Sequence, residues 1–172
     1  IQVPALDDTG AFPFTTNAGK ARIEGFEGTI SALVSEGVTF SAGASYQNAR
    51  LTEDQLEPNT GLAGDRIANV PKFMGNINID VMQPINDKID FIMNANISHR
   101  GSSQTDTAVT LDSYTSANIR AGIELEDWRV EVFVRNVFDT RAQIDAISSS
   151  QDPLARITIR PRTIGVSAKR SF

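Results

Sequence analysis

The chain is poor in the residues on which many enzymes and metal proteins depend. Its 172 residues include no cysteine and a single histidine, His99. Disulfides and thiolate-bound metals are therefore excluded, and so is a metal site built from several histidines. No nucleophile elbow, phosphate-binding loop or histidine–cysteine spacing occurs in the sequence. We therefore expect neither an enzyme, nor a metal site, nor a bound cofactor.

Excess positive charge and long apolar runs are also lacking. The net charge is −5 at pH 7, which argues against nucleic acid or an anionic membrane surface as a general partner. No stretch approaches the ~18 consecutive apolar residues of a membrane-spanning helix. The chain has no initiator methionine or signal peptide, and it opens with IQVPALDD, which reads as the tail of a strand. We expect a piece of a longer protein, or a mature chain.

What the sequence does have is alternation of apolar and polar residues with a period of two, the pattern of a β-strand. In VTFSAGASYQ, for example, Val38, Phe40 and Ala42 share one face, and the residues between them are polar or glycine. With a short opening stub at Ile1–Val3, about eight strands are expected. The long alternating segments are 26–34, 38–47, 72–81, 88–98, 116–126, 127–135 and 162–172.

The connections between these strands alternate in length. Three are short, at Ser35–Gly37, Pro84–Lys88 and Glu126–Asp127. The others are long and polar, at roughly 6–19, 51–70, 99–113 and 139–160. In an up-and-down antiparallel sheet, this order places every short turn at one end and every long loop at the other.

Strand length separates a membrane protein from a soluble one. The alternating segments run for about 9–12 residues, which matches the ~9–11 that a tilted strand needs to cross a bilayer. Strands of soluble proteins are usually about 5–6 residues long. Charged residues in mid-strand, such as Asp90, Arg120 and Glu131, are tolerable against a wet or plugged lumen and costly in a dry core. A transmembrane barrel is favoured over a soluble β-sandwich, which also alternates.

Three segments, taken in order, resemble the closing third of a TonB-dependent outer-membrane receptor. They are NAGKARIEGFEG (Asn17–Gly28), FVRNVFDTRA (Phe133–Ala142) and RPRTIGVSAKRSF (Arg160–Phe172). Two positions depart from a simple pattern. Arg170 stands where the family commonly has an aromatic residue, and there it would lie close to the lipid headgroups. Alternation points Asn136 outward, which places it near the top of the apolar band or in a bulge.

The resemblance implies an all-β fold, an antiparallel up-and-down transmembrane β-barrel of 22 strands with a plugged lumen. Residues 1–172 would form the C-terminal segment of the barrel domain, roughly its last eight strands. The plug domain and the TonB-contacting segment would lie outside this chain. The chain would then sit in the outer membrane of a Gram-negative cell and help to take up a scarce siderophore-, cobalamin-, haem- or carbohydrate-like solute. The implied partners are outer-membrane lipid and lipopolysaccharide, TonB, the plug domain, the barrel-assembly machinery and the small solute.

Ligand recognition would then fall in the long loops and the upper lumen. The last strand would point one row of side chains at lipid, and its terminal phenylalanine resembles the signal read by the barrel-assembly machinery. The residues of this expected signal are Ile164, Val166, Ala168 and Phe172. The candidate ligand-facing residues are Arg66, His99, Arg100, Gln104, Asp106, Arg141, Gln143 and Arg156.

Two other interpretations remain open from sequence. A self-contained eight-stranded outer-membrane barrel with a structural or adhesion role is possible, because eight strands can close around a packed interior. The family-like segments and the shortness of the stub at Ile1–Val3 favour a larger parent. A soluble β-rich binding module is the third interpretation and the least favoured.

Overall fold

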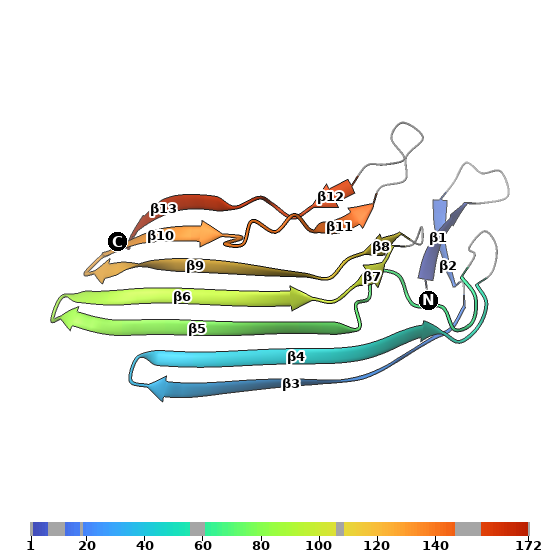
Figure 1. Ribbon diagram of the computed structural model, residues 1–172, viewed down its shortest axis with the longest axis horizontal. Coiled ribbons are helices and arrows are strands. Elements are labelled where there is room, and N and C mark those ends of the chain that lie inside the picture. The colour runs from blue at the N-terminus through green and yellow to red at the C-terminus, as the bar shows by residue number, and fades with distance from the viewer. Residues whose placement is uncertain are drawn as a thin grey trace.

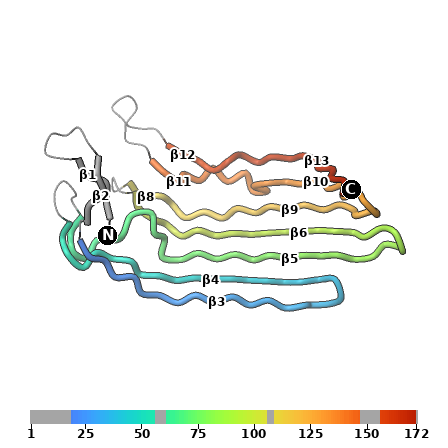
Figure 2. The backbone as a smooth tube through the Cα atoms, turned by 180° about the vertical axis from the view of Figure 1, so that it is seen from behind, coloured from blue at the N-terminus to red at the C-terminus, as the bar shows by residue number. Residues whose placement is uncertain are grey.

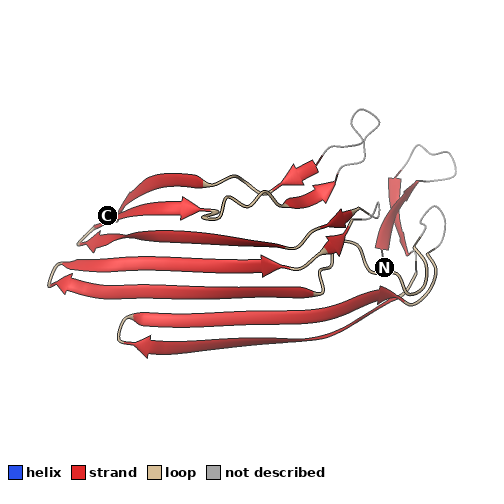
Figure 3. Cartoon of the chain, in the orientation of Figure 1, coloured by secondary structure: helices blue, strands red, loops and turns tan. Residues whose placement is uncertain are grey.

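The computed structural model describes residues 2–6, 13–17, 19–55, 61–105, 109–146 and 156–171. The regular structure in these ranges is β-strand, as the red arrows of Figure 3 show. They contain no helix long and apolar enough to cross a membrane. The long strands are β3 (Ala21–Ser35), β4 (Val38–Leu51), β5 (Phe73–Asn86), β6 (Ile89–Arg100), β9 (Tyr114–Leu125), β10 (Trp128–Arg135) and β13 (Thr163–Arg170). The short strands are β1 (Gln2–Leu6), β2 (Pro13–Asn17), β7 (Ser103–Gln104), β8 (Thr110–Leu111), β11 (Gln143–Ala146) and β12 (Arg156–Thr158).

The seven long strands form one antiparallel sheet in the order β13-β10-β9-β6-β5-β4-β3 (Figure 1). Each long strand pairs with the long strand that follows it along the chain, so the sheet is an up-and-down meander. This confirms the predicted all-β, antiparallel architecture. The period-two alternation of the sequence therefore predicted β-strands correctly.

The two ends of the sheet differ as predicted. Tight turns join β3 to β4, β5 to β6 and β9 to β10 at one end, and the first of them contains Gly37 at a φ of 69°. That left-handed conformation carries no steric cost for glycine. The long connections lie at the opposite end, where the hairpins β7–β8 and β11–β12 also sit (Figure 2).

One face of the sheet is apolar and exposed. Cross-strand register brings Ile77 opposite Ile97 and, one strand further, Ala117 on this face. Phe26 at 72% and Val166 at 70% are among its most exposed side chains. A soluble protein rarely leaves so large an apolar surface in water, because burial stabilises by about 25 cal/mol per Å². The face is suited to lipid, and this argues against the soluble β-sandwich.

The strand count and lengths differ in detail from the prediction. The first five long strands have 12 to 15 residues, whereas β10 and β13 have eight each. The opening stub belongs to β1, which pairs with β2 in a separate two-stranded sheet and places Gln2 opposite Asn17. The main sheet therefore has seven strands within this chain. Its edge strands, β3 and β13, do not pair with each other in the described ranges, so these residues do not close a barrel by themselves.

The two departures from simple alternation have local explanations. Asn136 follows the last residue of β10 with a φ of 52° and is 6% exposed. Its side-chain amide donates to the carbonyl oxygens of Thr140 and Arg160, so it turns into the loop instead of facing lipid. Arg170 lies near the short-turn end of β13, and its guanidinium sits over the Trp128 ring at 5.6 Å from the ring centroid. A cation–π contact at the membrane rim accommodates this charge.

Candidate functional site

Amide side chains line the middle of the polar face. Register places Asn78 of β5, Asn96 of β6 and Asn118 of β9 in one row across the sheet. The Nδ2 group of Asn94 donates to Oδ1 of Asn78 at 3.0 Å and to Oδ1 of Asp80 at 2.7 Å. Asparagine carries both donors and acceptors. This row of amides can therefore hydrogen-bond to a polar partner without presenting a fixed charge.

Charged residues extend the polar face toward β10. Arg129 and Glu124 form a hydrogen-bonded ion pair across the β9–β10 ladder. Glu131 and Arg135 border a cavity of about 540 Å³, which they share with the amide row. The predicted placement of mid-strand charges on a polar face is confirmed by this register. Such groups remain solvated only if this face borders water or another polar surface.

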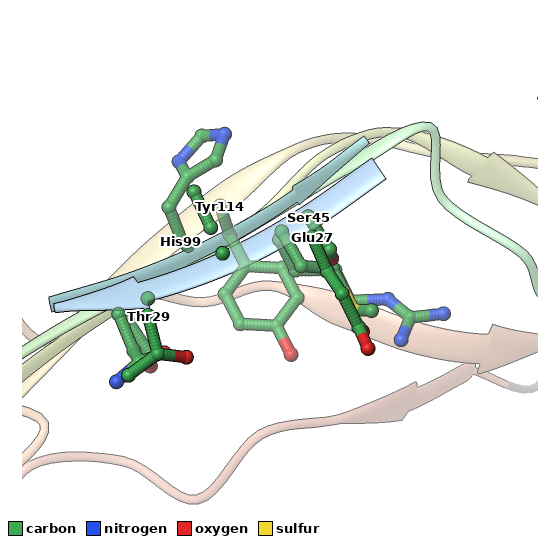
Figure 4. A pocket seen from close by; sticks show the side chains of 13 residues that line it. Glu27, Thr29, Ser45, His99 and Tyr114 are labelled. Carbon is green, nitrogen blue, oxygen red and sulfur yellow. The ribbon is translucent and has the colours of Figure 1, made fainter. Parts of the chain in front are cut away.

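A larger cavity of about 770 Å³ lies on the polar face nearer the long loops. Glu27 and Ser45 approach it from β3 and β4, and Arg100 and Tyr114 approach it from β6 and β9. Figure 4 shows Glu27, Ser45 and Tyr114 on the same side of the sheet. The cavity thus combines a carboxylate, a guanidinium, a phenol and a hydroxyl, a set able to bind a polar solute through charge-assisted hydrogen bonds.

Three of the sequence-predicted residues lie together above this cavity, around Asn69. Arg100 donates to the carbonyl oxygen of Asn69 at 2.8 Å, and the Asn69 N–H donates to the Gln104 carbonyl at 2.6 Å. Arg66 donates to the Ser102 carbonyl at 3.0 Å, so it ties the 61–70 segment to the end of β6. Asn69 itself has a φ of 61°. The guanidinium of Arg66 therefore orders this loop.

Three further predicted residues lie on or beside the hairpin β11–β12. Arg141 and Gln143 border a small cavity of about 240 Å³ together with Tyr114. Arg156 pairs with Ala146 in the ladder of the same hairpin. Arg141 also forms an ion pair with Asp139 at 3.2 Å. Tyr114 therefore lies beside Arg100 of the first group and beside Arg141 and Gln143 of the second.

Asp139 carries a perturbed carboxylate in this region. The backbone N–H of Arg162 donates to its Oδ1 at 2.9 Å. That hydrogen bond, aided by the Arg141 guanidinium, lowers the pKa of the Asp139 carboxyl below its ordinary value, because both favour the ionised form. The carboxylate links the end of β10 to the start of β13.

His99 lies on the other face of the sheet. It is part of β6 instead of a loop, and it shares the apolar face with Ile97 because the two are separated by two positions. Its Nδ1 is 2.9 Å from the Thr115 hydroxyl, and its ring centroid is 5.8 Å from that of Phe73. Figure 4 shows the ring pointing away from Glu27 and Tyr114. His99 thus borders the same cavity as Arg100, but its ring lies on the opposite face of the sheet.

Asp106 and Phe172 lie outside the described residues. Of the expected assembly signal, Ile164 and Val166 are 68% and 70% exposed on the apolar face. They pair there with Val134 and Val132 of β10. Ala168 continues the same row opposite Val130.

Sequence reasoning missed Glu27 and Tyr114. Strand alternation could have found both, because residues two positions apart in a strand share a face. Tyr114 lies two positions before Ser116, and Glu27 lies two positions before Thr29, on the polar face. The described ranges also hold no group of three His, Asp or Glu side chains that could bind a metal ion.

The fold and its two faces define a class, the wall of an antiparallel transmembrane β-barrel. A family model described as TonB dependent receptor-like, beta-barrel matches residues 1–137. The chain belongs to this family of TonB-dependent receptor β-barrels.

Solved receptor structures share the fold. The ferric yersiniabactin uptake receptor FyuA of Yersinia pestis matches with a TM-score of 0.79 and 18% identity over 92% of this chain. The ferric preacinetobactin receptor BauA of Acinetobacter baumannii matches with a TM-score of 0.68 and 18% identity over 99% of the chain. The ferripyoverdine receptor of Pseudomonas aeruginosa matches with a TM-score of 0.64 and 16% identity over 88% of the chain. The matched parts are 25%, 26% and 20% of those chains, so this chain spans about a quarter of their length.

Proposed function

We propose that this chain forms part of the barrel wall and outer loops of a TonB-dependent receptor that takes up a scarce solute across the outer membrane. The observation that carries the proposal is the division of a family barrel sheet into one exposed apolar face and one polar face lined by amides and charges. The apolar face would meet lipid, and the polar face would border the passage and its plug. The chemistry is binding and gating, with no bond made or broken.

The ligand-facing part of this proposal rests on the upper polar face. Arg100 and Tyr114 border the larger cavity there. The loop residues Gln104, Arg141, Gln143 and Arg156 surround the same end of the sheet. Guanidinium and phenol groups suit an anionic or oxygen-rich solute. The receptors FyuA, BauA and the ferripyoverdine receptor are named for ferric siderophores, which favours a solute of that kind over cobalamin, haem or a carbohydrate.

The proposal also extends to the whole protein. Residues 1–172 would be the C-terminal segment of a larger barrel domain, and a plug domain and a TonB-contacting segment would complete the receptor. The expected location is the outer membrane of a Gram-negative cell. Ile164, Val166, Ala168 and Phe172 are proposed to act as the signal for the barrel-assembly machinery.

Uptake by intact cells tests the function directly. Cells with and without the gene would be grown without iron and given ⁵⁵Fe bound to ferric siderophores, or ⁵⁷Co-cobalamin in a parallel assay. We expect one class of label to enter only when both the gene and TonB are present, and uptake to stop when the proton gradient is collapsed. Equal uptake of every label with and without the gene would contradict the proposal.

A further inference from the structure

The large cavity of the upper polar face has opposite charges at its two ends. One register row borders it, formed in strand order by Glu27, Ser45, Met74, Arg100 and Tyr114. Glu27 lies on β3, and Arg100 lies on β6, three strands further across the sheet. At ~4.8 Å between neighbouring strands, their backbones are about 14 Å apart. The cavity therefore separates a carboxylate from a guanidinium by the length of a small molecule.

Both charged groups remain available to a solute. Among the described residues, Glu27 takes part in no ion pair. Its neighbours on the polar face are uncharged, with Ser45 directly opposite and Gln47 on the diagonal. Arg100 donates to the Asn69 carbonyl at 2.8 Å, which leaves further guanidinium N–H groups to donate. Neither charge is therefore neutralised within the described part of the wall.

The floor between the two charges is polar but not ionised. Thr29, Asn76 and Ser98 border the cavity from the next register row. Of the described residues that border the cavity, Glu27 supplies the one carboxylate and Arg100 the one guanidinium. An occupant of this cavity thus meets a negative group at the β3 side, a positive group at the β6 side and hydrogen-bonding groups between them.

From this arrangement we infer that the solute carries both charges, with a cationic amine that pairs with Glu27 and an oxygen-rich or anionic group that pairs with Arg100. An ammonium group can donate to the carboxylate and to the Ser45 hydroxyl together, and a guanidinium can donate parallel hydrogen bonds to oxygen pairs. The volume of about 770 Å³ is typical of small-molecule sites. The inference rests on the proposed function and adds a positive charge to the anionic or oxygen-rich solute proposed there.

A matched pair of probes tests the carboxylate end of the cavity. One probe is a ferric trihydroxamate chelate with a free primary amine, and the other is the same chelate with that amine acetylated. The full-length receptor would be purified in detergent, and both affinities would be measured by titration calorimetry. We expect the wild type to bind the amine form about fivefold more tightly or better, because acetylation removes the charge that pairs with Glu27. Added salt should weaken this preference.

Substitutions at Glu27 assign the preference to its charge. Glu27→Gln should abolish the preference for the amine form and leave the affinity for the acetylated form unchanged. Glu27→Lys should reverse the preference, because like charges then meet. Glu36→Gln is the matched control, since it removes a carboxylate from the inner turn between β3 and β4. This control should keep the wild-type preference.

Substitutions at Arg100 test the other end of the cavity. Arg100→Gln should weaken the binding of both probes by the same factor, because both present the same hydroxamate oxygens. Arg100→Lys should restore part of that binding, because lysine keeps the positive charge. The gel mobility of each variant with and without heating checks that the barrel folds. A loss of the amine preference in Arg100→Gln, with Glu27 intact, would contradict the assigned orientation.

Equal affinity of the wild type for the two probes would overturn the inference, and so would a failure of both probes to bind. A preference for the amine form that survives Glu27→Gln would also overturn it. The outcome is separate from that of the proposed function. Uptake that requires the gene and TonB, by a receptor without amine preference, would defeat only this inference. Uptake of every label without the gene would defeat the proposed function, whatever the two affinities are.

Discussion

At the scale of single residues, Asn136 sets how the chain leaves β10. Its Nδ2 donates to the carbonyl oxygens of Thr140 and Arg160, both at 3.0 Å, and its Oδ1 accepts the Thr140 N–H at 3.0 Å. Asparagine also tolerates its φ of 52° better than most residues do. The side chain thus closes the loop that separates β10 from β13.

Replacing Asn136 by alanine should destabilise the protein by roughly 2–4 kcal/mol. Three hydrogen bonds of about 1 kcal/mol each are lost, and alanine disfavours the left-handed backbone by about 1 kcal/mol. Urea unfolding in lipid vesicles measures the change. Asn136→Gly is the control, since it keeps the conformation and loses only the hydrogen bonds. It should be less destabilising than alanine, and an equal effect would show that the backbone conformation costs nothing.

Asp139 should make stability depend on acidity. The pKa of its carboxyl is lower in the folded state than in the unfolded chain, so its stabilising effect is complete above the unfolded pKa of about 3.9 and is lost as pH falls through the folded value. Wild type and Asp139→Asn should therefore differ most in urea midpoint above about pH 5 and converge as the pH falls through the folded pKa. A difference that stayed constant with pH would show that the charge does not act.

At the scale of the strand, alternation separates lipid from lumen within one element. Val166 and Ser167 are neighbours in β13, yet Val166 pairs with Val132 and Ser167 with Glu131. The first pair lies on the apolar face and the second on the polar face. One strand therefore offers two adjacent positions with opposite surroundings.

Val166→Arg should cost roughly 2–4 kcal/mol, the value for a charge on the lipid face near mid-bilayer. Ser167→Arg should cost less than about 1 kcal/mol, because its side chain joins the charged polar face. Folding yield and urea midpoint in vesicles provide the comparison. Equal costs at the two positions would contradict the assigned faces.

Alternation predicted the long strands well because each exposes opposite faces to two different media. It could not show that β6 continues through His99 to Arg100, since a histidine beside an arginine resembles a loop. The left-handed backbone at Asn136 interrupts the alternation of side chains between the two faces, so alternation could not predict where the Asn136 side chain points. The hairpins β7–β8 and β11–β12 depend on pairing between distant segments, for which short strands leave no periodic signal.

The sequence also could not predict which candidate residues lie close together. Arg100 and Gln104 meet because the backbone of Asn69 bridges them from another loop. Tyr114 joins both groups because β9 lies between β6 and β10. Such proximity follows from strand order and register instead of from spacing along the chain.

At the scale of the whole molecule, the sheet is longer than a bilayer is thick. β3 and β4 have 15 and 14 residues, against the ~9–11 of a membrane crossing. Because the short turns share one end, the extra length projects with the long loops from the other (Figure 1). The large cavity lies on the polar face toward that end of the sheet.

The central claim is that one face of this sheet meets lipid and the other meets water, and cysteine scanning with spin labels tests it most directly. The chain has no cysteine of its own, so single labels can be placed at Ile77, Asn78, Ile79 and Asp80 of β5 in the membrane-embedded protein. Labels at Ile77 and Ile79 should collide mainly with oxygen dissolved in lipid, and labels at Asn78 and Asp80 mainly with a water-soluble nickel complex. Collision rates that do not alternate along β5, or that alternate in the opposite sense, would contradict the account.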